Sequence, residues 1–266
     1  MYFFSFYLEL VFKGDNKYNL NDKKLMIIAI IIGRKGSVGF PKKNTFKILN
    51  KPLASYAIEA AKKVDRIDKI YLSTDDPNLI KLGMQHDINL IKRPKYLSTK
   101  KALAEDAFVH AYKKIKSKEK SNIDLVVLLM CNAPTITENQ IIKGINILEK
   151  NKDIDSAITV SKYNMYSPLR ARKINNNGLL DPFVPFNIFG NPKTLNCDRG
   201  SQGDVWFADM ACSIVKSKCL TNIGEGLLPQ KWMGKKIYPI KQEFGLDIDY
   251  EWQVPQTEFW IKKNLK

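Results

Sequence analysis

The sequence predicts an α/β fold built on a mainly parallel β-sheet, and three observations support this prediction. Short apolar runs rich in β-branched residues recur along the chain, as in Ile27–Ile32, and strands buried on both faces of a parallel sheet have this composition. Segments with helical periodicity follow these runs, which indicates βαβ units with right-handed crossovers. Finally, no internal repeat or low-complexity linker divides the 266 residues, so one main domain is expected.

Up to residue 150 the expected strands and helices alternate. Pro52 and Pro77 stand where the first turns of helices are expected, and Asp76 is placed to cap the second of these helices. We expect strands at Ile27–Ile32, Ile70–Leu72, Leu90–Ile91 and Asp124–Met130, and helices from Pro52 through Val64, after Pro77, over Ala102–Lys118 and over Glu138–Lys150.

After residue 150 the rhythm is interrupted once. A strand is expected at Ala157–Val160, but residues 163–204 are rich in Asn, Pro and Gly and lack clean periodicity. A stretch of this length is usually a functional loop or an inserted hairpin. The pattern resumes with strands at Val205–Val215 and Lys236–Ile240 and ends with a helix from about Val254.

The charge of the chain bears on its partners. A formal net charge of +16 favours an anionic partner. Such a partner could be a nucleic acid, a membrane surface or a polyphosphate substrate. The lysines are scattered, and many stand at helical spacing where a solvated face explains them, so nucleic-acid binding is not expected.

The N-terminus and the cysteines indicate the compartment. Residues 1–12 are apolar but interrupted by Glu9, and they are shorter than the roughly 20 residues of a membrane-spanning helix. We therefore expect no membrane partner, and we interpret residues 1–25 as an appendage or an upstream start, with the main domain over 26–266. The four cysteines form no Cys-x-x-Cys pair, so we expect reduced thiols in the cytoplasm and no zinc site. The two histidines, His86 and His110, fall in helical patterns, which argues against a His-based hydrolase.

The segment with the most chemistry is residues 33–44, with the sequence GRKGSVGFPKKN. It follows the first strand, at the carboxyl edge where open parallel sheets bind ligands. Glycines let backbone N–H groups approach phosphate oxygens, while Arg and Lys add positive charge. Its spacing differs from both the dinucleotide-binding fingerprint and the Walker A loop. Taken alone, a solvated basic turn is an equally good interpretation.

This loop resembles the first motif of the acylneuraminate and 3-deoxy-manno-octulosonate cytidylyltransferases. The residues in register are Arg34, Ser37, Gly39, Pro41, Lys43 and Asn44. The segments that recur in the order of that family are Lys51-Pro52-Leu53, Ser73-Thr74-Asp75-Asp76, Arg93-Pro94 followed by Leu97, and Asp247-Ile248-Asp249. The resemblance covers about residues 26–265. It implies a Rossmann-like sheet of the nucleotide-diphospho-sugar transferase type with a small inserted dimerisation element.

The resemblance also implies roles for the matching residues. Arg34 and Lys43 would hold the triphosphate of CTP, with Ser37 and Asn44 near the nucleotide and Arg93 in the cytidine pocket. Bidentate arginine and mobile lysine suit phosphate. A structural ion pair is the alternative role for Arg93.

Asp247 and Asp249 are separated by one residue, so in an extended segment both carboxylates point the same way. Two such groups make a hard oxygen site suited to Mg²⁺. The alternatives are a cap for the final helix and the metal motif of a glycosyltransferase. With the resemblance, Asp247 and Asp249 are expected to bind the metal and, with Arg34 and Lys43, to form the catalytic set.

The sequence departs from the family pattern mainly on the sugar side. Val38 replaces a lysine, and the fourth strand ends in Met130-Cys131-Asn132-Ala133-Pro134. We expect Asn132, Asp209 and Arg199 to contact the sugar, Arg199 because a guanidinium fork suits a carboxylate. A solvated Arg199 is an equal alternative.

The resemblance implies a homodimer formed through residues 163–204, in which Phe183, Val184, Phe186 and Phe189 form an apolar contact or pack under a loop. The expected function is transfer of CMP from CTP to an acidic nonulosonic or ulosonic sugar, with release of pyrophosphate. The alternatives are a nucleotidyltransferase with another nucleotide or acceptor, a catalytically weak nucleotide-binding homologue and a basic nucleic-acid binder.

Overall fold

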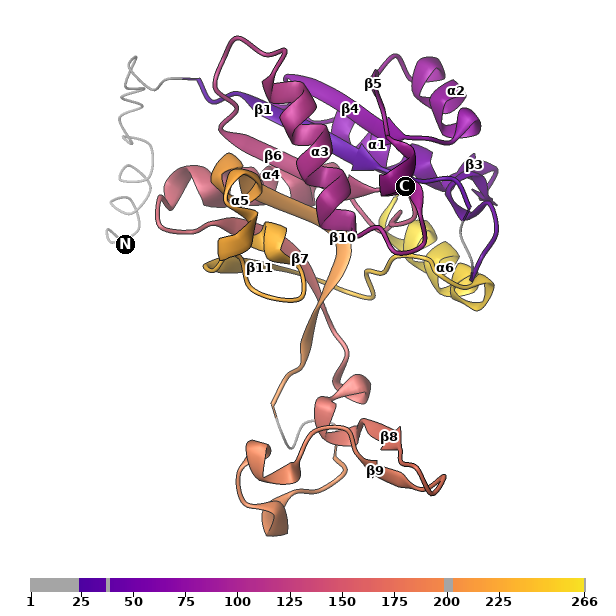
Figure 1. Cartoon of the computed structure of the whole chain (residues 1–266), viewed down its shortest axis with the longest axis vertical. Coiled ribbons are helices and arrows are strands. Elements are labelled where there is room, and N and C mark those ends of the chain that lie inside the picture. Colours follow the sequence, from indigo (N-terminus) through magenta and orange to yellow (C-terminus); the bar gives the residue numbers. More distant parts are fainter. Residues whose placement is uncertain (1–23, 37–38, 199–202, 266) are drawn as a thin grey trace, which may run out of the picture.

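The computed structural model of the chain describes residues 24–36, 39–198 and 203–265, and it contains a central seven-stranded sheet with the strand order β11-β7-β10-β6-β1-β4-β5 (Figure 1). These strands are β1 Ile27–Ile32, β4 Lys69–Thr74, β5 Asn89–Lys92, β6 Leu125–Met130, β7 Ser156–Lys162, β10 Trp206–Lys216 and β11 Ile237–Gln242. The predicted mainly parallel sheet is confirmed, and β10 is the strand that runs antiparallel to both of its neighbours.

The helices also follow the sequence pattern, except for the short α5, which was not expected. They are α1 Leu53–Lys62, α2 Pro77–Gln85, α3 Ala104–Lys116, α4 Glu138–Lys150, α5 Ser217–Thr221 and α6 Val254–Asn264. Asp76 caps α2 as expected, since its side chain accepts a hydrogen bond from the N–H of Asn78 at 2.9 Å. At α4, Thr137 and Gln140 form a reciprocal capping box, which satisfies amide groups that the helix leaves free.

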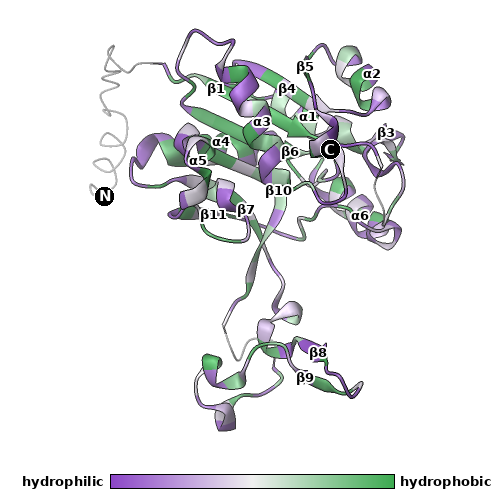
Figure 2. Cartoon of the chain, viewed as in Figure 1, coloured by the Kyte–Doolittle hydropathy of each residue, from purple (hydrophilic) through white to green (hydrophobic). Residues whose placement is uncertain are grey.

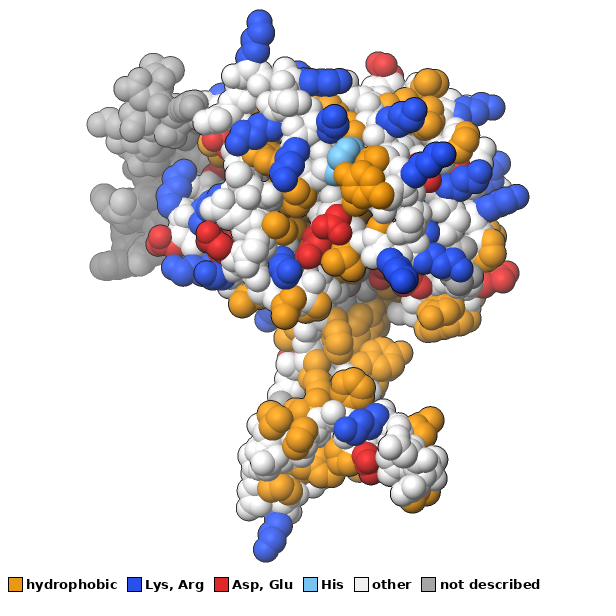
Figure 3. Space-filling model, in the orientation of Figure 1, with side chains coloured by type: hydrophobic (Ala, Val, Ile, Leu, Met, Phe, Trp, Pro, Cys, Tyr) orange, Lys and Arg blue, Asp and Glu red, His pale blue; other side chains and the backbone are white. Residues whose placement is uncertain are grey.

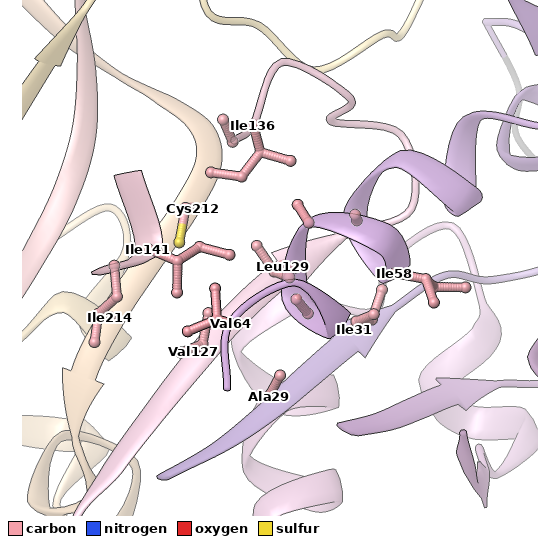
Figure 4. Packing of buried hydrophobic residues seen from close by; sticks show 14 of the residues in the cluster. Ala29, Ile31, Ile58, Val64, Val127, Leu129, Ile136, Ile141, Cys212 and Ile214 are labelled. Atoms are coloured by element: carbon pink, nitrogen blue, oxygen red, sulfur yellow. The ribbon is translucent and has the colours of Figure 1, made fainter. Parts of the chain in front are cut away.

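The core occupies both faces of the sheet because the side chains of β1 alternate between them. Ala29 and Ile31 pack with α1, α2 and α4 in one buried cluster, part of which Figure 4 shows. Ile28 and Ile30 pack with α3 and α5 in a second cluster. Figure 2 shows the apolar sheet between helices whose outer faces are polar. Every residue of β1 is buried, so its continuous apolar composition follows from coverage on both sides.

A third, smaller cluster holds the C-terminal segment against the body. Leu246 and Ile248 pack there with Trp260 of α6 and with Phe40 and Ile48. Ile48 belongs to a short hairpin of β2 (Lys47–Ile48) and β3 (Lys51–Pro52). This packing brings the segment around residue 248 next to the loop that follows β1, although the two lie more than 200 residues apart.

The irregular segment expected at 163–204 is an inserted arm. It leaves the body between β7 and β10 and carries the hairpin of β8 (Arg172–Ile174) and β9 (Leu180–Pro182) (Figure 1). Apolar side chains gather on the arm and its stem, while lysines and arginines are spread over the visible face of the body (Figure 3). Phe183 is 63% exposed, so in the single chain it does not pack under a loop.

Two further observations concern the helices and the cysteines. None of the helices in the described part of the chain is long and apolar enough to cross a membrane. The four cysteines are free, and three of them are buried. The expected appendage, residues 1–25, lies almost entirely outside the described residues.

Candidate active site

A cavity of about 320 Å³ lies at the carboxyl end of β1, the edge at which ligands bind in open α/β sheets. The loop after β1, the start of α3, the end of β6 and the C-terminal segment before α6 surround it. Its lining residues include Arg34, Gly39, Lys43, Asn44, Arg93, Leu97, Leu103, Asn132, Asp249 and Tyr250. Six of the predicted site residues therefore lie at one cavity. Their positions in the sequence do not by themselves require them to be close in space.

Close packing against Cys131 and hydrogen bonds within the loop fix the shape of the loop after β1. A Cβ on Gly33 would lie 2.6 Å from Cys131 Sγ, so only glycine lets the chain turn this close to β6. The buried amide of Asn44 donates to the carbonyl of Arg34 at 3.1 Å. Arg34 Nη1 in turn donates to the carbonyl of Gly36 at 2.6 Å. Asn44 thus supports the shape of the loop, while Ser37 and the Val38 substitution lie outside the described residues.

Lys43 and Asp249 form an ion pair across the cavity mouth. Lys43 comes from the loop after β1, and its side chain is only 15% exposed, whereas that of Asp249 is 57% exposed. The pair joins a predicted phosphate ligand to a predicted metal ligand. Lys43 offers a positive charge to an incoming anion, and Asp249 offers a negative charge to an incoming cation. Contacts with these ions could replace the contact between the two side chains.

Asp247 lies deeper than Asp249 and shares its side of the segment. Leu246 and Ile248 are buried in the core, so alternation places the two carboxylates on the opposite side. Asn132 Nδ2 donates to Asp247 Oδ2 at 3.3 Å and to the carbonyl of Ile248 at 3.0 Å. Burial, followed by the neighbouring charge of Asp249, raises the pKa of Asp247 above its usual value. A like-charged pair with a raised pKa is typical of a functional site.

The alternative role of these two aspartates as a helix cap is excluded. The turn Glu251–Gln253 precedes α6, and Tyr250 occupies its N-cap position. The Gln253 side chain accepts hydrogen bonds from the N–H groups of Asp249 and Tyr250 at 2.7 and 2.8 Å. The carboxylates of Asp247 and Asp249 are therefore not used for capping.

Arg93 is buried, with 5% of its surface exposed, yet it lines the cavity. Burial lowers its pKa below the ordinary value of an arginine. Within the described residues its Nε has no hydrogen-bond partner, and no carboxylate forms a salt bridge with it. The alternative of a structural ion pair thus finds no partner in this part of the chain. Buried polar groups are normally satisfied, so this guanidinium is suited to a ligand that enters the cavity.

The predicted sugar contacts separate in the structure. Asn132 lines the cavity, whereas Asp209 is 4% exposed and absent from the lining. The Asp209 carboxylate accepts hydrogen bonds from Ser161 Oγ and Gln242 Nε2, both at 2.8 Å. These bonds join β7, β10 and β11 and give no support to a role in sugar binding. Arg199 lies outside the described residues.

Sequence reasoning missed the aromatic and aliphatic part of the lining. Tyr250, Leu97 and Leu103 border the cavity but were not expected there. The position of Tyr250, directly after the two aspartates, was the available signal. Leu97 stands in the family pattern after Arg93-Pro94, but no role was expected for it, and nothing in the local sequence distinguishes Leu103 from an ordinary loop residue.

Comparison with known proteins agrees with this geometry. The sequence profile of the cytidylyltransferase family matches residues 28–177, which include β1 from its second residue, the loop after it and Arg93. An N-acylneuraminate cytidylyltransferase of Escherichia coli is 27% identical over 143 residues, covering 54% of this chain and 33% of the relative. A pseudaminic acid cytidylyltransferase of Campylobacter jejuni is 33% identical over 113 residues, covering 42% of this chain and 48% of the relative. The chain thus aligns with between a third and a half of the length of these two relatives.

Solved structures share the fold. A CMP:2-keto-3-deoxy-manno-octonic acid synthetase complexed with CTP has a TM-score of 0.63 at 14% identity, covering 90% of this chain and all of the other. A 4-diphosphocytidyl-2C-methyl-D-erythritol synthase has a TM-score of 0.60 at 10% identity, covering 90% of this chain and 99% of the other. With its family profile matched over more than half of the sequence and its sheet and loop arranged as described, the chain belongs to the cytidylyltransferase family.

Proposed function

We propose that this protein transfers CMP from CTP to an acidic nonulosonic or ulosonic sugar and releases pyrophosphate. One observation carries the proposal: the cavity is bordered by the cations Arg34, Lys43 and Arg93 and by Asp249, which pairs with Lys43. Asp247 is hydrogen-bonded to Asn132 of the same lining. A nucleoside triphosphate needs the cations, and an acceptor hydroxyl that loses a proton needs a carboxylate. The relatives named above act on N-acylneuraminate and pseudaminic acid, which points to this class of acceptor.

In the proposed reaction an acceptor hydroxyl oxygen attacks the α-phosphorus of CTP. The bond from this phosphorus to the oxygen that bridges to the β-phosphate breaks, and pyrophosphate leaves. Arg34 and Lys43 stabilise the charge that develops on the phosphate oxygens, and the protein acts mainly by positioning and electrostatics. One aspartate of the Asp247–Asp249 pair would receive the hydroxyl proton.

We further propose Mg²⁺ as the cofactor. Asp247 and Asp249 are the residues that would hold it, because they offer oxygen ligands of like charge on one side of the segment. No group of three or more potential ligands occurs in the described ranges. This fits a cation that keeps several waters and takes further ligands from substrate phosphates. When bound, Mg²⁺ neutralises phosphate charge.

The remaining features of the proposal concern assembly and compartment. We propose a homodimer, because large apolar side chains of the arm are left exposed, among them Leu180, Phe183 and Ile188, and contiguous exposed apolar surface marks interaction sites. We propose a cytoplasmic location, which the four free cysteines support. Nucleic acid and membrane are not proposed as partners.

The test is a pyrophosphate-release assay with CTP, ATP, GTP and UTP, each combined with N-acetylneuraminate, pseudaminic acid, legionaminic acid and 3-deoxy-manno-octulosonate. We expect release with CTP and one acceptor only. Lys43→Met and Asp247→Asn should each lower kcat/KM by roughly 10²-fold or more, the usual effect of removing one positioned electrostatic group. Release with another nucleotide would instead support the alternative nucleotidyltransferase. CTP binding without turnover would support the weak homologue, and absence of CTP binding would refute both.

A further inference from the structure

Two aromatic rings lie exposed beside the cavity. Tyr250 and Trp252 stack with their ring centroids 6.2 Å apart and an interplanar angle of 11°. Their residues are 53% and 68% exposed. Trp232 and Trp260, by contrast, are buried in the core, with 4% and 3% exposed. The two stacked rings form one exposed apolar surface next to the cavity, and contiguous exposed apolar surface marks interaction sites.

The backbone and the loop after β1 hold this pair in position. The Gln253 side chain binds the N–H groups of Asp249 and Tyr250, which fixes the turn that carries both rings. Gly39 lies against Tyr250, since a Cβ built there would stand 3.1 Å from a ring carbon. The pair is therefore preorganised, and a rigid ring loses little entropy when a ligand docks on it.

The location indicates which substrate would meet the rings. Tyr250 lines the cavity next to Asp249, whereas Arg93, Leu97 and Leu103 line it from the segment between β5 and α3. β5 is one edge of the sheet, four strands from β10. If the nucleotide base lies toward Arg93, then the acceptor hydroxyl enters from the side of the carboxylates. Tyr250 borders the cavity directly after Asp249 in the chain, and the ring of Trp252 stacks on it. Both rings therefore lie close to the carboxylate that an acceptor would approach.

We propose that Tyr250 and Trp252 form an aromatic platform that binds the apolar face of the acceptor sugar. The inference rests on the proposed function and assigns it an acceptor subsite. An aromatic face is apolar and carries partial negative charge, whereas one face of a pyranose presents C–H groups of slight positive charge. Trp252 is 68% exposed, so its indole N–H can donate to a hydroxyl or an acylamido oxygen of the sugar.

A direct test uses the fluorescence of Trp252, which does not depend on turnover. Acceptor sugars are titrated into the wild-type protein and into Trp252→Phe in the presence of CTP. We expect the wild-type protein to show a change in emission that saturates with one acceptor and is absent in Trp252→Phe. An equal change in both proteins would place the sugar away from the platform and overturn the inference.

Kinetics supply the second test, with Trp252→Ala, Trp252→Phe and the control Phe259→Ala, which removes another exposed ring from α6 (59% exposed). Trp252→Ala should raise the acceptor KM roughly 2- to 10-fold, as expected for one aromatic contact, without changing the KM for CTP. Trp252→Phe should retain most of the affinity, and Phe259→Ala should match wild type. A role of Trp252 in folding alone would instead lower Tm and leave both KM values unchanged.

The two proposals can fail separately. If the enzyme turns over CTP and an acceptor, but Trp252→Ala leaves the acceptor KM unchanged, then the platform is refuted and the proposed function stands. If no acceptor gives either turnover or a fluorescence change, then both proposals are wrong.

Discussion

Asp155 joins three segments on the side of the sheet away from the cavity, and its removal should destabilise the fold. It stands just before β7 and is 9% exposed. One carboxylate oxygen accepts hydrogen bonds from the N–H groups of Lys235 and Lys236 at 2.9 and 3.0 Å. The other pairs with Lys218 Nζ at 2.6 Å. The carboxylate thus links the starts of β7 and β11 to α5.

The pKa of Asp155 sets the expected magnitude. Burial raises this pKa, but the hydrogen bonds from Lys218 and from the two backbone N–H groups outweigh it and lower the pKa from 3.8 to about 2. One pKa unit corresponds to about 1.4 kcal/mol. The ionised carboxylate therefore contributes about 2 kcal/mol to the free energy of unfolding at neutral pH. Because the folded pKa is depressed, this stability is present above pH 3.8 and is lost as the pH falls toward 2.

Urea denaturation followed by circular dichroism tests this reasoning. At pH 7 we expect Asp155→Asn to lower the free energy of unfolding by about 2 kcal/mol, which corresponds to a Tm lower by roughly 4–8 °C. The difference from wild type should shrink to about half near pH 3. Asp153→Asn is the matched control, because Asp153 is an exposed aspartate two residues earlier. If Asp155→Asn unfolds at the same urea concentration as wild type at pH 7, then the linkage argument is wrong.

Two further predictions concern a turn and the cavity. Gly226→Ala should lower the free energy of unfolding, measured by urea denaturation, by roughly 1–3 kcal/mol, because the added Cβ would lie 1.8 Å from the backbone oxygen of Lys231. The control Gly224→Ala should be nearly neutral, because a Cβ there would have no atom within 4 Å. Arg93→Met should leave Tm unchanged or higher, because it removes a buried charge without a salt-bridge partner. The same substitution should raise the KM for CTP by roughly tenfold or more in the pyrophosphate assay, and an unchanged KM would show that the nucleotide does not contact Arg93.

The elements of the fold were largely predictable because they depend on local patterns. The apolar run at Ile27–Ile32 is the strand β1, and the helix expected at Glu138–Lys150 is α4 with the same bounds. Continuous burial leaves an unbroken apolar run, and helical amphipathicity leaves a 3.6-residue period. The antiparallel direction of β10 was not specified by its sequence, because an apolar strand reads the same in either direction.

The candidate site was predictable only in part. The loop of Arg34, Lys43 and Asn44 was found from its charge, its glycines and its place after a strand. The role of Asp247 and Asp249 as metal ligands stays a prediction. Their alternative role as a helix cap is excluded, because Tyr250 holds the N-cap position and Gln253 binds the N–H group of Asp249. Asp209 was expected at the sugar, but the structure shows it hydrogen-bonded to Ser161 and Gln242. Its partners lie on strands distant in the sequence, so no local pattern could identify them.

The sequence by itself determined the order of strands and helices, the basic loop after the first strand and the resemblance to a cytidylyltransferase, because each is encoded in neighbouring residues. Only the tertiary structure decided which of those residues share one cavity. Lys43 reaches Asp249, and Asn132 reaches Asp247, across 206 and 115 positions. Such contacts arise when Leu246 and Ile248 bury themselves against the loop after β1. The hydrophobic effect that drives this burial does not depend on orientation. Which polar side chains become neighbours therefore depends on how the whole chain packs and not on the local sequence.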